Sequence, residues 1–209
     1  MSADVAPTPR TRGRPRAFDR NAALAKATRV FWEKGFEATS MADLTVAMGI
    51  GSPSLYAAFG SKEALYGEAL SYYRHTYEHL IWSHFFSKST AREAFQSWLL
   101  DSAAALTGCL VDIPRGCMVT LSVVGSEEHA GLGELLRATR AVTLARLTTR
   151  LDRAVEEQEL PPSVDVHALA RFMQTVQSGM SILARDGADR FELEAVARVA
   201  MLGFAQSAS

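Results

Sequence analysis

The sequence predicts an all-α fold with about nine helices, arranged as a three-helix N-terminal head and a larger helical body. Apolar side chains recur every three or four residues along most of the chain, which is the period of a helix buried on one side. Glycines and prolines separate these periodic stretches. The apolar fraction of 48% and the charged fraction of 22% are ordinary for a folded domain with a full core.

The first helix is predicted to begin after Asp19 and to end at Gly35. Asp19 is a typical N-cap residue, and Phe18 before it can pack back on the helix as a hydrophobic staple. Residues 1–17 are rich in Pro, Ala, Thr and Arg. Such a segment cannot bury a core, so we expect a flexible basic arm there.

Two short helices joined at Gly49 are predicted next. Ser40 is a good N-cap, and Asp43 three residues later can complete a capping box. Gly49 stands where a helix often ends in a left-handed residue. Ser52 can cap the following helix, with Pro53 at its first helical position. A helix of about two turns is not stable alone, so its neighbours must hold it, with its outer face free to meet a partner.

The remaining helices are predicted from the same periodicity. A fourth helix should run from Ser61 to about Phe86, with one end in the head and the other in the body. Further helices are expected over 91–106, 134–159, 166–186 and 190–206. Residues 116–124 are apolar, and periodicity does not separate a strand from a short buried helix there. Asp165 should cap the penultimate helix, and Gly187 should end it.

Charge is distributed unevenly along the chain. Through Leu65 there are nine Lys/Arg and six Asp/Glu, and from Tyr66 onward there are thirteen against seventeen. A basic front and an acidic rear fit a DNA-contacting head on a body that does not touch phosphate. A random fluctuation in a neutral protein is the alternative.

The cysteines and the apolar stretches of the sequence indicate where in the cell the protein is found. Cys109 and Cys117 are too few for a disulfide framework, and reduced thiols are the default in a cytoplasm. No stretch approaches the ~20 consecutive apolar residues of a membrane span. The N-terminus lacks the apolar segment of a signal peptide. We therefore expect a cytoplasmic protein without a membrane partner.

The run from Gly49 to Leu65 (GIGSPSLYAAFGSKEAL) resembles the DNA-binding signature of TetR/AcrR-type transcriptional regulators. The preceding residues 23–25 and 31–44 resemble it too, so the resemblance covers roughly the first third of the chain. It implies a helix-turn-helix domain over 18–64, whose second helix enters the DNA major groove. It also implies a helical ligand-binding and dimerisation domain over 65–209, with a short buried helix within 116–124.

The resemblance implies a set of DNA-facing residues, with Leu55 and Phe59 packing inward. Tyr56 and Lys62 fit phosphate contacts, as does Thr39 or Ser40, and the arginines of the arm fit an A·T-rich minor groove. The candidates are Arg12, Arg14, Arg16, Thr39, Ser40, Ser52, Pro53, Ser54, Tyr56, Ala57 and Lys62. Many relatives carry an aromatic residue or His where this chain has Ala57-Ala58. Alanines cannot hydrogen-bond a base edge, so more specificity must come from the arm and from DNA shape.

Two further sets of candidates lie in the body, and plain core packing is the alternative for both. Aromatic and Met side chains are candidates for an apolar ligand pocket: Tyr73, Tyr77, Phe85, Phe95, Trp98, Met118, Leu121 and Phe172. Small and apolar residues of the last two helices are candidates for a four-helix dimer interface. These are Met173, Val176, Gly179, Met180, Val196, Ala200 and Gly203.

These features favour a regulator, and a repressor in particular, that binds palindromic operator DNA as a homodimer and is released by a small-molecule effector. Alternatives are metal sensing through His75 and His79, a thiol redox switch through Cys109 and Cys117, an activator, or a helical ligand-binding protein without DNA function. We expect no enzyme, because Glu127-Glu128-His129 has no catalytic partner visible in the sequence. No cofactor or resident metal is expected.

Overall fold

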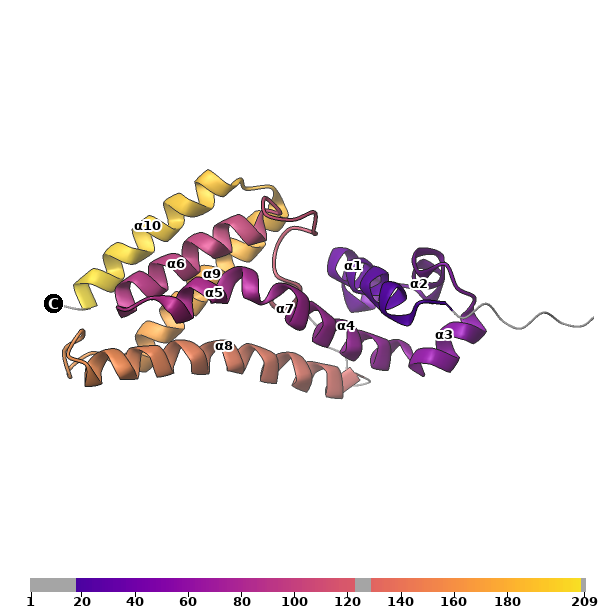
Figure 1. The fold of residues 1–209 in the computed structure, drawn as a ribbon, viewed down its shortest axis with the longest axis horizontal. Coiled ribbons are helices and arrows are strands. Elements are labelled where there is room, and N and C mark those ends of the chain that lie inside the picture. The colour runs from indigo at the N-terminus through magenta and orange to yellow at the C-terminus, as the bar shows by residue number, and fades with distance from the viewer. Residues whose placement is uncertain (1–17, 123–128, 208–209) are drawn as a thin grey trace, which may run out of the picture.

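The computed structural model describes residues 18–122 and 129–207, and within these ranges it contains ten α-helices and no strand. The prediction of an all-α fold is confirmed. Figure 1 shows α1, α2 and α3 grouped at one end, α4 leading away from them, and the remaining helices forming the body. The helices are α1 Arg20–Ala38, α2 Met41–Met48, α3 Ser52–Phe59, α4 Lys62–Tyr77, α5 His79–Ser87, α6 Ala91–Leu106, α7 Met118–Leu121, α8 Ala130–Glu156, α9 Val166–Asp186 and α10 Arg190–Ser207.

Helix α1 begins where the sequence predicted. The Asp19 carboxylate accepts hydrogen bonds from the backbone N–H groups of Asn21 and Ala22, at 2.9 and 3.0 Å. Gly35 has a φ of 79° and a ψ of 171°, which breaks the helical path. One more turn follows it to Ala38, so the predicted end at Gly35 is a kink rather than the terminus.

The hinge between α2 and α3 follows the predicted chemistry, with one correction. Ser40 and Asp43 form a complete capping box, and Gly49 adopts the left-handed conformation. The N-cap of α3 is Gly51, however, and Ser52 is already helical. No side chain caps this helix. Pro53 in the first turn lacks an N–H group, so one donor fewer needs a partner there.

The predicted fourth helix is divided. Helix α4 ends at Tyr77 and α5 begins at His79, which explains why ten helices are described instead of about nine. Glu78 between them keeps helical dihedral angles, with φ −58° and ψ −34°. The two helices pack against different neighbours: α4 lies on α1, whereas α5 lies on α6.

The body helices lie close to their predicted positions. Helix α6 has the predicted bounds, α7 is a single short turn, and α8 begins four residues before the predicted Glu134. Asp165 caps α9 by accepting from the N–H of Ala168, and Gly187 ends it in the left-handed conformation.

Two groups of buried apolar residues form the core. One joins α5, α6, α8, α9 and α10 in the body. The other begins between α1, α2, α3 and α4 and continues into α7 and α8. The head therefore shares its core with the nearest part of the body, so a change in the body can reach it through packed side chains.

Candidate functional site

The outer face of α3 is uncovered by the described chain. Ser52, Pro53, Ser54 and Ala57 are exposed, and the Tyr56 side chain is 49% exposed. Leu55 and Phe59 of the same helix are buried in the core of the head. The short helix is thus fixed through one side and free on the other, as a recognition helix requires.

The candidate phosphate contacts around α3 differ in availability. Thr39 is buried and donates its hydroxyl hydrogen to the Gly35 carbonyl, so the structure does not present it to DNA. Ser40 is exposed, but its hydroxyl belongs to the capping box with Asp43. Lys62 stands at the start of α4 with its Nζ atom 4.3 Å from the centre of the Phe36 ring. That cation–π contact holds the ammonium group on the head near the recognition helix.

Arg12, Arg14 and Arg16 lie outside the described residues. Their assignment to the minor groove therefore stays a prediction.

Head and body are joined by hydrogen bonds to the end of α1. The indole Nε1 of Trp32 donates to the Gly116 carbonyl at 2.9 Å. Arg185, at the end of α9, donates to the carbonyls of Trp32 at 2.8 Å and Glu33 at 3.0 Å. A cation is favoured near the C-terminal end of a helix, where the carbonyl oxygens point. The first helix of the head is therefore attached directly to α9 and to the loop at Gly116.

A cavity of about 590 Å³ lies beside α4 in the body. Side chains from α4, α5, α6, α8 and α9 line it, together with the segment around α7. Trp32 of the head also contributes to its wall, and the Trp32 ring meets Tyr73 edge-on at 4.6 Å. The volume suits a small organic molecule. Because Trp32 belongs to the head, a molecule in this cavity would touch both parts of the protein.

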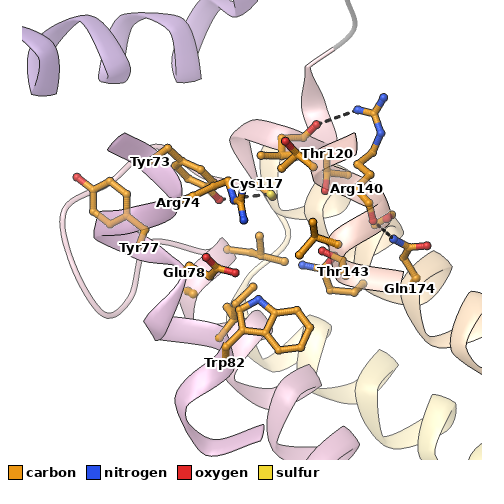
Figure 2. A pocket seen from close by; sticks show the side chains of 18 of the residues that line it. Tyr73, Arg74, Tyr77, Glu78, Trp82, Cys117, Thr120, Arg140, Thr143 and Gln174 are labelled. Carbon is orange, nitrogen blue, oxygen red and sulfur yellow. Dashed lines mark hydrogen bonds between the residues drawn. The ribbon is translucent and has the colours of Figure 1, made fainter. Parts of the chain in front are cut away.

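Figure 2 shows one wall of the cavity, where Tyr73 points toward Cys117. The Tyr73 hydroxyl donates to the Cys117 Sγ at 3.3 Å. Burial raises the pKa of Tyr73 well above its ordinary value, with a further contribution from Cys117. The phenol therefore keeps its proton, and this wall presents neutral hydrogen-bonding groups.

Comparison with known proteins decides the family. Residues 23–69 match the model described as "Bacterial regulatory proteins, tetR family". The chain is 36% identical over 191 residues to the HTH-type transcriptional repressor ComR of Escherichia coli (strain K12), with 90% of each protein covered. It is 30% identical over 196 residues to the repressor BdcR of the same organism, with 91% of each covered. The chain belongs to the TetR family.

A solved relative gives the same result for the fold of this TetR-family regulator. The structure of the TetR family regulator CifR, a cysteine mutant complexed with 26-bp double-strand operator DNA, matches with a TM-score of 0.84 and 38% identity. The match covers 90% of this chain and 98% of CifR. The expected family and its general architecture are confirmed.

The structure separates the predicted pocket residues of this TetR-family chain into two groups. Tyr73, Tyr77 and Trp98 line the cavity. Phe85, Phe95, Met118, Leu121 and Phe172 are not among its lining residues. Phe85, Phe95 and Met118 are buried in the two cores, and Phe172 is 44% exposed on α9. Phe85, Phe95 and Met118 face the cores and Phe172 faces outward, so their assignment to a pocket is not supported. Leu121 is half-buried next to the lining residue Gly116.

Several lining residues were missed by the sequence reasoning, above all Trp32, Arg74, Arg140 and Gln177. The predicted pocket contained only aromatic, Met and Leu side chains of the body. Trp32 lies in the predicted head, and the arginines of the helix predicted over 134–159 were expected on its outer side. The sequence offered one signal for these residues: Arg74 is a charged residue between the aromatic residues Tyr73 and Tyr77 of α4.

The last two helices of this TetR-family chain expose an apolar face. It consists of Phe172, Ile182, Leu183, Val196, Val199 and Leu202, all at least 37% exposed. Among the predicted interface residues, Val196 belongs to this face, and Val176, Gly179 and Gly203 are half-buried. Met173, Met180 and Ala200 are buried in the chain's own core and cannot meet a partner directly. The exposed apolar face lies on the two helices that were predicted to form the interface. Most of the residues on that face, however, differ from the predicted ones.

The structure gives little support to the metal, thiol and catalytic sites that the sequence left as alternatives. Within 18–122 and 129–207 no group of three or more His, Cys, Asp or Glu side chains is placed to hold a metal, so His75 and His79 have no third ligand there. Cys109 is exposed and accepts a hydrogen bond from the Thr107 hydroxyl, whereas Cys117 accepts from Tyr73. Glu127 and Glu128 lie outside the described residues. No helix of the described chain is long and apolar enough to cross a membrane.

Proposed function

We propose that this TetR-family protein is a repressor that binds a palindromic operator as a homodimer through α3 and leaves it when a small molecule occupies the cavity beside α4. The free outer face of α3 carries this proposal. The complex of its relative CifR with operator DNA supports it.

The proposed DNA contacts divide into three kinds. Tyr56 and Lys62 bind phosphates on either side of α3. Ser52, Pro53, Ser54 and Ala57 lie against the major groove, where the methyl group of alanine can touch a thymine methyl group. The arginines of the arm add minor-groove contacts. Because α3 offers few groups that read bases, DNA shape contributes to operator choice.

Release follows from the shared wall of the cavity. A ligand that pushes on Tyr73 or Trp32 changes the packing between α4, α1 and the loop at Gly116. The head then turns relative to the body, and the two α3 helices of a dimer lose the spacing of successive major grooves. The ligand drives this change only by binding the released state more tightly than the DNA-bound state.

A protein with this role acts where the chromosome lies, so we place it in the cytoplasm. We assign it no catalytic activity. Its rival is a helical ligand-binding protein without DNA function, and DNA binding distinguishes the two.

Operator binding tests the proposal. Binding to the DNA upstream of the protein's own gene is measured by fluorescence anisotropy across a salt series. Tyr56→Ala should weaken binding about tenfold, because it removes a hydrogen bond to a charged group. Lys62→Gln should weaken binding and reduce the salt slope by about one ion.

Lys88→Gln is the control, because Lys88 is an exposed cation at the end of α5, in the body. It should bind like the parent. Equal affinities and salt slopes for all three variants and the parent would contradict the proposed interface.

A further inference from the structure

The charged groups that line the cavity are unbalanced. Among the described lining residues there are four arginines, Arg74, Arg137, Arg140 and Arg171, and a single acid, Glu78. Glu78 forms an ion pair with Arg146 of α8. The cavity therefore has an excess of positive charge. Among the described lining residues Glu78 is the only carboxylate, and Arg146 already neutralises it.

Three of the four arginines have partners. Arg140 donates to the carbonyl of Val119 at 3.1 Å, and Arg137 pairs with Glu134 at 2.7 Å. Arg171 donates to the Gln174 side chain at 3.1 Å. These groups are engaged with the protein itself.

Arg74 is different. Its guanidinium group makes no hydrogen bond or ion pair with any residue in 18–122 or 129–207, although the residue is half-buried. Figure 2 shows its side chain extending from α4 into the pocket beside Tyr73. A cation partly removed from water without a partner is costly, and an anion placed against it recovers that cost. Arginine can bind a carboxylate or sulfonate through two parallel hydrogen bonds.

A second unpartnered group lies on α9. Gln177 is only 5% exposed, lines the same cavity, and its side-chain amide has no hydrogen-bond partner among the described residues. A buried amide is normally paired. The Nε1 atom of Trp98, on α6, also lacks an acceptor in this part of the chain. The cavity thus leaves the Gln177 amide to be satisfied as well as a cation.

Apolar and aromatic side chains form much of the remaining wall, beside several threonines. It includes Tyr77, Ile81, Trp82, Leu106 and Leu144. Such a wall favours an apolar body, and the cavity volume of about 590 Å³ accommodates one or two rings with a short substituent.

We propose that the effector is an apolar organic anion whose acidic group pairs with Arg74 while a polar atom of its body bonds to Gln177. This rests on the proposed function, because it names the ligand class of the same cavity.

Two matched probes test the role of charge. 1-Anilinonaphthalene-8-sulfonate carries an anionic group on two aromatic units, and N-phenyl-1-naphthylamine has the same skeleton without the sulfonate. Affinities of the purified full-length protein are measured by fluorescence titration. The anionic probe should bind at least about tenfold more tightly, because it gains charge-assisted hydrogen bonds to the guanidinium group.

Variants locate the effect. Arg74→Gln should weaken the anionic probe about tenfold and leave the neutral probe unchanged, whereas Arg74→Lys should retain part of the preference. Arg153→Gln is the matched control, because that arginine lies on α8 outside the cavity lining, is exposed and pairs with Glu157. Thr143→Phe fills the cavity from α8 and should abolish binding of both probes.

The proposal is overturned if the neutral probe binds as tightly as the anionic one, if Arg74→Gln has no effect, or if binding survives Thr143→Phe. Operator anisotropy in the same samples separates this result from the proposed function. If the protein prefers the anionic probe but does not bind the operator, only the proposed repressor function is refuted. If it binds the operator but shows no preference for the anionic probe, only the proposal of an anionic effector is refuted.

Discussion

Gly116 shows how much a single residue contributes to the attachment of the head. Its φ of 78° lies in the left-handed region, and a Cβ atom there would lie 2.5 Å from Leu121 Cδ1 and 2.8 Å from the Ser181 carbonyl oxygen. Its own carbonyl accepts the hydrogen bond from Trp32. Any side chain at this position therefore strains the backbone and displaces two neighbours.

Gly116→Ala is expected to lower the free energy of unfolding by about 2 kcal/mol, from backbone strain plus steric overlap. Urea denaturation followed by tryptophan fluorescence measures it. Gly131→Ala is the control, because no atom lies within 4 Å of a Cβ built there. A Gly116 variant as stable as the Gly131 variant would show that the close approach is not restrictive.

Among the elements, α2 depends most clearly on its cap. Asp43 accepts hydrogen bonds from Lys34 at 2.7 Å and from the Ser40 backbone N–H at 2.9 Å. These interactions, with Lys34 the largest, hold the pKa of the Asp43 carboxyl well below its ordinary value. A depressed pKa means that the charged carboxylate favours the folded state.

The stabilising contribution of Asp43 should be complete above the ordinary aspartate pKa of about 4 and decline as the pH falls below it. The free energy of unfolding of the parent should therefore drop more steeply below pH 4 than that of Asp43→Asn, in denaturant titrations at successive pH values. Parallel pH profiles would contradict this assignment.

Ser40→Ala should cost about 1 kcal/mol at neutral pH, because α2 loses its N-cap. Ser54→Ala, at an exposed position on α3 where the side chain forms no hydrogen bond within the described residues, is the stability control. Thermal unfolding followed by circular dichroism compares the two. A Ser40 variant that unfolds together with the Ser54 variant would show that the cap contributes little.

The same elements show what could be predicted from sequence. The caps at Asp19, Ser40 and Asp165 depend on chemistry within four residues and were found. The division at Glu78 was missed, because it reflects which neighbours α4 and α5 pack against and no local breaker marks it. Whether an aromatic residue faces the core or the cavity depends on the surrounding helices, so sequence periodicity could not separate Phe95 from Trp98.

At the scale of the whole molecule, the apolar face of α9 and α10 has no cover in the described chain. Val199 is 68% exposed and Leu202 is 65% exposed, and neighbouring positions extend the face along both helices. An exposed face of this kind is typical of a binding surface. A two-fold axis through it would bring two such helix pairs together, so that the symmetric contact also sets the distance between the two recognition helices.

Val199→Glu should therefore convert a dimer into a monomer and weaken operator binding, because burying a carboxylate in an apolar contact is costly. Size-exclusion chromatography with light scattering measures the mass. Val46→Glu, at an 82% exposed position on α2, is the control and should keep the parent's mass. A Val199→Glu variant that remains a dimer would place the contact elsewhere.

Trp32 belongs to the head and also lines the cavity, which limits how the ligand specificity of this protein can be engineered. Biosensor design usually randomises every side chain around a pocket to obtain a new ligand specificity. In this protein a library that includes Trp32 would alter the repressed state together with the specificity, and many members would lose their output. Diversity confined to the α8 positions Thr139 and Thr143 changes the pocket and leaves both residues of the Trp32–Gly116 hydrogen bond in place.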